Sequence, residues 1–245
     1  MAHLYIGCSG YLYADWRGGA FYPQGLRHKD EFAYYAGRFN TVELNSTFYR
    51  QPKESVWEGW EQRAPEGFLY AVKMSRLLTH IKQLEDPEEV WEQFYAGAQR
   101  LRDHLGPILF QLPPSLTKDV GKLERLAQVL PQELQFAFEF RHLSWFDGEV
   151  YALLRQRNWA LTVVSHPYLP FVPEVTAHCV YLRFHGQKSL YSSFYSEGEL
   201  AEFAGHIVGW LRAGLTVYAY FNNSARGFAA QNALTLKALV GRSVA

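Results

Sequence analysis

Residues 41–50 read TVELNSTFYR, and the character of this stretch changes halfway along. Val42 and Leu44 suit a buried strand, yet Glu43 lies between them and Asn45 follows at once. Side chains alternate across a strand, so Val42 and Leu44 face one way while Glu43 and Asn45 face the other. The pattern predicts a strand with one apolar face and one polar face, followed by a loop, NSTFYR.

Other runs along the chain repeat this pattern of one bulky apolar face and one face that turns polar at the carboxyl end. QFAFEFR (135–141) puts three phenylalanines on one side and Glu139 and Arg141 on the other. The polar residues found in the same way near other strand ends are Lys73, Gln111, Arg183, His185 and Asn222. Their shared position at strand ends indicates a common functional location.

Short β-rich runs alternate with helical patterns along the whole chain. The expected strands are 4–8, 41–45, 68–73, 107–112, 135–141, 160–165, 179–185 and 215–222. The expected helices are 29–39, 54–63, 86–105, 118–130, 147–157, 196–212 and 229–240. Asp86 is the expected N-cap of one helix, and Ser196 with Glu199 forms a capping box for another.

Strands that alternate with helices pair in parallel through crossovers. A doubly wound sheet also fits this order, but GCSGYLYADWRGG after the first strand lacks the glycine spacing of a nucleotide-binding loop. The chain of 245 residues suits one barrel. We therefore predict an α/β fold, a single (β/α)₈ TIM-barrel-like domain over residues 1–245, with parallel strands and polar residues at its C-terminal mouth.

The bulk composition narrows the class of protein. A formal charge of zero counts against binding long nucleic acid through the overall field. Two cysteines in apolar runs do not make a disulfide framework, and no signal peptide or membrane-length apolar run is visible. These features predict a cytoplasmic protein with buried, reduced thiols and no membrane partner.

Several blocks together resemble one known family. They include IGCSGYLYADWRGGAFYP, TVELNSTFYR, LTHIKQL, LGPILFQLPPS, FEFRHLSWF, VYLRFHG and the FNN block, in this order from about residue 3 to residue 240. Together they are similar to the YecE-like family, the domain of unknown function seventy-two. The resemblance implies a TIM barrel and a relation to sugar-isomerase-like barrels, but no particular activity. The chain departs from many relatives at Ser165 and Ser224, where those relatives carry acidic residues.

Two carboxylates on different strands suit acid–base chemistry, because unequal surroundings can separate their roles. We predict Glu43 and Glu139 as the acid–base pair, with Lys73 and Arg183 as anion or transition-state stabilisers. The structural alternative is that these groups only form ion pairs, Glu43 with Lys73 and Glu139 with Arg183. The neighbouring cations also argue against a metal, so no cofactor is predicted; a divalent ion held by oxygen and nitrogen ligands is the less favoured alternative.

Residues after the strands are predicted to bind the ligand. Aromatic rings stack on sugars or bases and arginines hold phosphates, although rings in loops also form local cores. The predicted ligand-binding residues are Asn45, Tyr49, Arg50, Gln111, Arg141, His142, His185, Asn222, Asn223, Tyr11 and Trp16.

The favoured function is an enzyme acting on a small polar ligand, a sugar or phosphate ester, by isomerase-like or hydrolase-like chemistry. One alternative is a protein that processes nucleic acid or binds a single strand, which the neutral charge disfavours. Another is a barrel that binds a small molecule without turnover.

Overall fold

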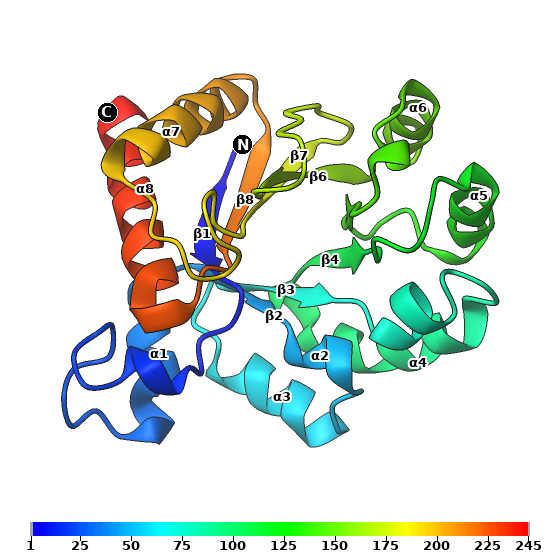
Figure 1. Ribbon diagram of the computed structural model, residues 1–245. Coiled ribbons are helices and arrows are strands. Elements are labelled where there is room, and N and C mark those ends of the chain that lie inside the picture. Colours follow the sequence, from blue (N-terminus) through cyan, green and yellow to red (C-terminus); the bar gives the residue numbers. More distant parts are fainter. Residues whose placement is uncertain (1, 245) are drawn as a thin grey trace. The chain divides into compact units, whose positions relative to one another are not determined.

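The computed structural model describes residues 2–244 and confirms the predicted fold class. Its strands are parallel and follow the order β1-β8-β7-β6-β5-β4-β3-β2, with helices between them, as in a (β/α)₈ TIM-barrel-like fold (Figure 1). The strands are β1 (Leu4–Cys8), β2 (Thr41–Leu44), β3 (Leu69–Lys73), β4 (Leu105–Gln111), β5 (Phe136–Glu139), β6 (Ala160–Ser165), β7 (Cys179–Phe184) and β8 (Thr216–Phe221). Every expected strand is therefore present, within two residues of its predicted ends.

The helices lie where the apolar periodicity predicts them, with one addition. They are α1 (Glu31–Ala36), α2 (Ser46–Tyr49), α3 (Glu54–Arg63), α4 (Glu88–Ala98), α5 (Val120–Val129), α6 (Gly148–Gln156), α7 (Glu197–Arg212) and α8 (Phe228–Val244). The short α2 corrects the expectation of a loop after the second strand. The range Ser46–Tyr49 is too short for an apolar period to appear in the sequence.

The expected helix 86–105 is wrong at both ends. Asp86 does not cap it: its φ is 40°, and the N-cap position belongs to Pro87. At the other end the α-helix gives way to a 3₁₀ stretch, Gln99–His104, which contains Arg102 with a φ of 49°. By contrast, the capping box of Ser196 and Glu199 at the start of α7 is confirmed.

The described chain divides into two compact units. The first contains residues 1–43, 163–173 and 179–245, and the second contains residues 44–162 and 174–178. The boundary at residue 163 runs through β6, so that strand contributes to both. The expectation of one domain over residues 1–245 stays a prediction.

In the first unit, α7 and α8 pack on the strands β1 and β8 (Figure 1). Tyrosines of this unit gather on the strand face opposite the helices, as the alternation predicts. Tyr181 lies 5.1 Å from Tyr220 between ring centroids, and Tyr218 stacks on Tyr5 at 5.0 Å. The Tyr220 hydroxyl is 2.8 Å from Oγ1 of Thr41 on β2. These rings fill the interior of the unit with large, partly polar side chains.

Side chains join β1 to β2 in the first unit. The Asn40 side chain accepts a hydrogen bond from the backbone N–H of Ile6 at 3.2 Å and donates one to the carbonyl of Leu4 at 2.8 Å. The Tyr35 hydroxyl accepts from the N–H of Cys8 at 2.8 Å. Gly7 permits the close approach, because a Cβ there would lie 2.1 Å from the carbonyl oxygen of Thr41. We call this junction the β1–β2 seam.

In the second unit, aromatic rings cover the helix-facing side of β4 and β5. Phe110 stacks on Phe138 at 5.1 Å, Phe138 stacks on Trp159 at 4.7 Å, and Trp91 of α4 meets Phe136 at 5.8 Å. Phe136 and Phe138 therefore share one face, as the alternation predicts. The other face of these strands is left for polar groups.

Both cysteines are buried free thiols. Burial raises the pKa of Cys179 to about 12 and raises that of Cys8 as well. Deprotonation is therefore strongly disfavoured at both sulfurs, so neither has the low pKa that marks a nucleophilic cysteine.

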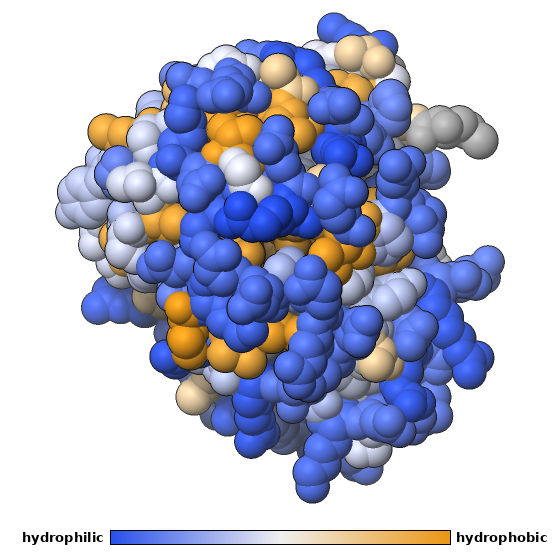
Figure 2. Space-filling view, turned by 90° about the vertical axis from the view of Figure 1, so that its right-hand side faces the viewer, coloured by the Kyte–Doolittle hydropathy of each residue, from blue (hydrophilic) through white to orange (hydrophobic). Residues whose placement is uncertain are grey.

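Exposed apolar side chains are scattered rather than continuous. Figure 2 shows one face, on which hydrophobic residues form separate patches among hydrophilic ones. Exposed apolar residues such as Leu12 and Leu143 are ordinary for a protein surface. Within residues 2–244 no helix has the length and apolar character needed to cross a bilayer.

Candidate functional site

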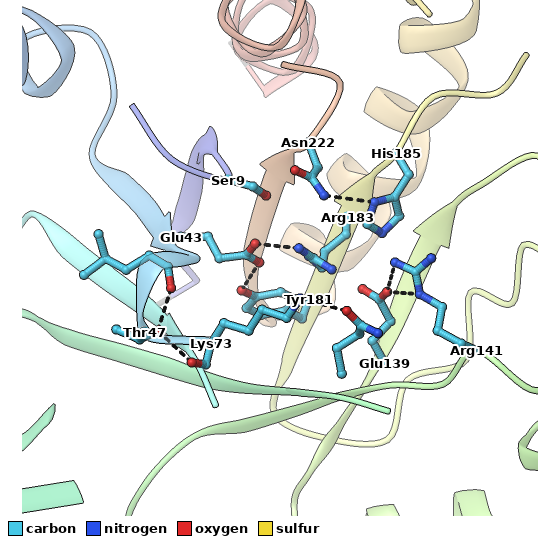
Figure 3. Close-up of polar contacts among 12 residues, drawn as sticks. Ser9, Glu43, Thr47, Lys73, Glu139, Arg141, Tyr181, Arg183, His185 and Asn222 are labelled. Atoms are coloured by element: carbon cyan, nitrogen blue, oxygen red, sulfur yellow. Dashed lines mark hydrogen bonds and ion pairs between the residues drawn. The ribbon is translucent and has the colours of Figure 1, made fainter. Parts of the chain in front are cut away.

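The candidate site residues fall into two groups, one in each unit. In the first unit the Glu43 carboxylate, which is completely buried, is held from β7 (Figure 3). One oxygen, Oε1, accepts from Nη2 of Arg183 at 2.7 Å, and Oε2 accepts from the Tyr181 hydroxyl at 2.7 Å. Burial, together with the nearby carboxylate, raises the pKa of Tyr181 well above its ordinary value, so the hydroxyl stays a donor. The stretch TVELNSTFYR thus places the Glu43 carboxylate in a buried position where Arg183 balances its charge.

A histidine and an asparagine lie at the carboxyl ends of β7 and β8. His185 is fully buried, and its Nδ1 is 3.2 Å from Nδ2 of Asn222, which donates (Figure 3). The ring of His166 meets His185 edge-on at 5.6 Å. Both predicted ligand-binding residues are therefore brought together, and their role in binding stays a prediction.

Other predicted residues of the first unit hold the surrounding loops. Asn223 donates to the Ser193 carbonyl and to Oδ1 of Asn232, both at 2.9 Å. The Ser165 hydroxyl is 2.8 Å from the Tyr195 hydroxyl, and the Ser224 carbonyl accepts from the indole of Trp16 at 2.7 Å. Ser165, through its hydroxyl, and Ser224, through its backbone carbonyl, thus make neutral hydrogen bonds.

The aromatic residues after β1 are enclosed by packing. Trp16 is completely buried, and Tyr11 packs against Phe32 at 5.2 Å and Tyr35 at 5.9 Å. This packing favours the alternative that Tyr11 and Trp16 form a loop core, and their binding role stays a prediction.

The group in the second unit begins with Lys73 at the end of β3. Its ammonium, 8% exposed as a residue, donates to Oε1 of Gln111 at 2.7 Å and lies 4.1 Å above the Phe48 ring. The Thr47 hydroxyl approaches the backbone carbonyls of Leu44 and Lys73 at 2.9 Å and 2.7 Å, which ties α2 to the ends of β2 and β3. Sequence reasoning missed Thr47, because nothing in the sequence distinguishes it from an ordinary threonine in the segment after β2.

Glu139 and Arg141 form a buried ion pair in this unit. Gln111 and Glu139 are register partners on β4 and β5, and both nitrogens Nε and Nη2 of Arg141 contact Oε1 of Glu139 (Figure 3). The carboxylate is fully buried, whereas Arg141 retains partial exposure. Glu43 and Glu139 thus each have an arginine partner within their own unit. The pairs expected from sequence, Glu43 with Lys73 and Glu139 with Arg183, stay predictions.

The remaining predicted ligand-binding residues lie around α2 and after β5. Tyr49 is 70% exposed and Arg50 is also exposed, so both can meet a ligand. Asn45 is the N-cap residue of α2 and makes no side-chain cap bond there. His142 caps a 3₁₀ turn, where its Nδ1 accepts from the N–H of Ser144 at 3.2 Å. The structure gives His142 a local structural role, and its binding role stays a prediction.

His80 is the polar residue that sequence reasoning did not single out. Its Nε2 lies 3.5 Å from Nε2 of Gln111, and its ring meets Phe48 edge-on at 4.9 Å. Burial and the positive charges of Lys73, Arg76 and Arg141 lower the pKa of His80 to about 4. The only sequence signal was its place in the block LTHIKQL, because His80 is not on a strand.

Among residues 2–244 no cluster of three or more His, Cys, Asp or Glu side chains is placed to hold a metal ion. Each unit holds a buried carboxylate paired with an arginine at the strand ends, which defines an α/β barrel protein with buried ion pairs.

Comparison with known proteins identifies the family. The model of the family described as "Protein of unknown function DUF72" matches residues 5–245, so the chain belongs to the DUF72 family. The UPF0759 protein YunF of Bacillus subtilis is 25% identical over 262 residues, which cover 94% of this chain and 92% of that protein. The UPF0759 protein YecE of Escherichia coli K12 is 26% identical over 144 residues, 58% of this chain and 50% of that protein.

Solved structures agree with the fold. A DUF72 family protein of Thermotoga maritima, TM1631, has a TM-score of 0.89 and 33% identity, with 98% of this chain and 99% of that chain covered. A DUF72 family protein of Enterococcus faecalis has a TM-score of 0.84 at 20% identity, with 97% and 95% covered. The resemblance to the YecE-like family is thereby confirmed.

Proposed function

We propose that this protein binds a small anionic ligand, a phosphate ester or sugar phosphate, at the carboxyl ends of β3, β4 and β5 and performs acid–base chemistry on it. The observation that carries the proposal is the positive field of this group. Burial first, and then the positive charges of Lys73, Arg76 and Arg141, lower the pKa of the half-buried His80 to about 4, so three cations act on one side chain. Such a field favours an anion.

Donors of suitable geometry accompany the charge. Lys73 supplies a point charge, and the guanidinium of Arg141, whose Nε and Nη2 contact Glu139, has further N–H groups that can donate to a phosphate oxygen. Gln111 is fixed by Lys73 and lies beside Glu139 in register. Carboxyl ends of barrel strands are where such enzymes carry their ligands.

Glu139 is the acid–base group of this proposal. It is buried, and Arg141 fixes the orientation of its carboxylate and balances its charge. The sequence-based suggestion that Glu43 is the second acid–base group stays a prediction.

A thermal-shift panel tests the binding. Sugars, sugar phosphates, nucleotides and short single strands are each added, with and without a divalent metal. A ligand at a hundred times its Kd should stabilise the protein by about 2.7 kcal/mol. We expect sugar phosphates or other phosphate esters to shift the wild type, and the shift to disappear in Lys73→Gln.

The control variant is Lys53→Gln, which removes an exposed lysine of the same unit at the start of α3. It should respond like the wild type. Stabilisation by neutral sugars alone, or by single strands alone, would contradict the proposal. Turnover of a bound ester is then followed by phosphorus NMR, and Glu139→Gln should retain binding while losing turnover.

A further inference from the structure

The connection that follows β3 is strained. Residues Leu77–Ile81 form a π-helical turn, and Gln83, Leu84 and Asp86 beyond it have φ values of 49°, 67° and 40°. Left-handed conformations of non-glycine residues and π-helical turns both occur often at functional sites. His80 lies inside this turn, so the strained segment positions its imidazole against Gln111.

The hydrogen bonds of Gln111 determine which way its amide points. Lys73 has only donors, and its ammonium lies 2.7 Å from Oε1 of Gln111, so that atom is the amide oxygen. The NH₂ group therefore faces Nε2 of His80, at 3.5 Å, and also donates to the Leu112 carbonyl at 3.3 Å. Facing a donor, Nε2 of His80 must be an acceptor.

The other side of the ring leads to the same assignment. The buried Thr79 hydroxyl donates its single proton to the Ser75 carbonyl at 3.2 Å, and its oxygen lies 2.9 Å from Nδ1 of His80. With the Thr79 proton on the Ser75 carbonyl, Nδ1 donates the ring proton to the Thr79 oxygen, which agrees with Nε2 as the acceptor. A neutral imidazole with its proton on Nδ1 and a lone pair on Nε2 satisfies both contacts.

This lone pair is only weakly engaged. The 3.5 Å separation from Gln111 is at the outer limit of a hydrogen bond, and both side chains are half-buried. The charged groups around the ring are Lys73 on β3, Arg76 before the turn and Arg141 after β5, and all three disfavour a proton on Nε2. An acceptor is thus held among cations.

We propose that His80 makes the anion site selective for an oxyanion that carries its own O–H group: hydrogen phosphate, or the monoanion of a phosphate ester. This inference rests on the proposed anion site. Lys73 and Arg141 satisfy the charged oxygens, while Nε2 accepts the remaining O–H. Sulfate, which has no proton to donate, places an oxygen lone pair against that of Nε2. Polar groups left unpaired in this way give strong discrimination between similar ligands.

Hydrogen phosphate and sulfate form a matched pair of probes at about pH 8, since they share shape and charge and differ by one O–H. Isothermal titration calorimetry on the full chain should show phosphate binding at least about tenfold more tightly than sulfate. Equal affinity for the two ions would overturn the inference and leave anion binding intact. Absence of binding by either ion, and of any response to phosphate esters, would overturn the proposed function with it.

Three variants place the selectivity on His80. His80→Ala should bind phosphate and sulfate equally. In His80→Gln the amide oxygen can replace Nε2 as acceptor, so the preference should return. His178→Ala, an exposed histidine of the same unit, should behave like the wild type. Retention of the full preference by His80→Ala, in a variant that unfolds at the wild-type temperature, would contradict the inference.

The pH dependence of phosphate-ester binding provides a second test, because the ester loses its last proton at about pH 6. His80 keeps its neutral form down to about pH 4. The affinity of the wild type for a simple phosphate ester, relative to sulfate, should therefore fall between about pH 5 and pH 8, and His80→Ala should show no such fall. A relative affinity that rises over this range in the wild type would overturn the inference.

Discussion

Buried charges are the most consequential residues of this protein. Glu43 is completely buried, and both of its oxygens are bonded to side chains of β7. Replacing one partner of a buried ion pair leaves the other charge unbalanced, which costs about 3 kcal/mol or more. We expect Glu43→Gln to lower the free energy of unfolding in urea by that amount.

The comparison for this variant is Glu54→Gln. Glu54 has a side chain that is 75% exposed and pairs with Arg100 at 2.8 Å, so its loss should cost less than about 1 kcal/mol. Equal losses in the two variants would show that burial does not set the value of the Glu43 pair.

His80 should contribute to the pH dependence of stability. Its pKa falls from 6.5 to about 4 on folding, so between these values the unfolded chain binds the proton that the native protein does not. Stability then rises as pH increases from about 4 to about 6.5 and is unaffected by this group above that window. Urea unfolding at several pH values should show a smaller rise for His80→Gln than for the wild type. An identical slope in both proteins would mean that His80 titrates normally in the native state.

At the scale of elements, the β1–β2 seam depends on one glycine. A Cβ at Gly7 would meet the Thr41 carbonyl oxygen at 2.1 Å and the Tyr35 hydroxyl at 2.8 Å. We expect Gly7→Ala to destabilise the protein by about 3 kcal/mol in thermal or urea unfolding, because two strands must separate.

Gly59 is the matched control for this substitution. It lies in α3 with nothing within 4 Å of an added Cβ. Alanine there should stabilise by about 0.5–1 kcal/mol, since glycine is a poor helix residue. A Gly7→Ala variant as stable as the wild type would show that the seam can widen without cost.

The elements were predictable wherever local chemistry decides them. Alternation placed Glu43, Glu139 and Arg183 on the inward faces, and the capping box fixed the start of α7. Asp86 misled, because Asp86 itself and the nearby Gln83 and Leu84 adopt left-handed conformations, which leave no local sequence signal.

At the scale of the whole molecule, the chain passes between its two compact units four times, at residues 43/44, 162/163, 173/174 and 178/179. Units connected in this way cannot fold from separate continuous segments. We expect one cooperative unfolding transition. Tryptophan fluorescence, for which five of the seven indoles lie in the second unit, should give the same urea midpoint as far-UV circular dichroism. Two distinct midpoints would contradict the single-domain prediction.

The sequence predicted which polar residues belong to the candidate site, but not which side chains pair with each other there. Strand parity identified the polar residues at the strand ends, since each lies on a strand of known direction. The partners of Glu139 and the role of His80 depend on rotamers and on a π-helical turn, neither of which periodicity encodes. Tyr11 and Trp16 show a different limit of sequence-based prediction. An aromatic residue in a loop has the same sequence signature whether its ring packs inward or contacts a ligand.

The two buried thiols report on local opening of the strands that carry them. Cys8 on β1 and Cys179 on β7 both belong to the first unit, and both sulfurs react only as thiolates, which burial suppresses. An alkylating reagent can therefore react with Cys8 only when β1 opens, and with Cys179 only when β7 opens. The labelling rate of each sulfur measures how often its strand opens under native conditions, without any engineered probe. Since β1 forms one side of the seam, faster labelling of Cys8 than of Cys179 would identify the seam as the place where the native sheet first comes apart.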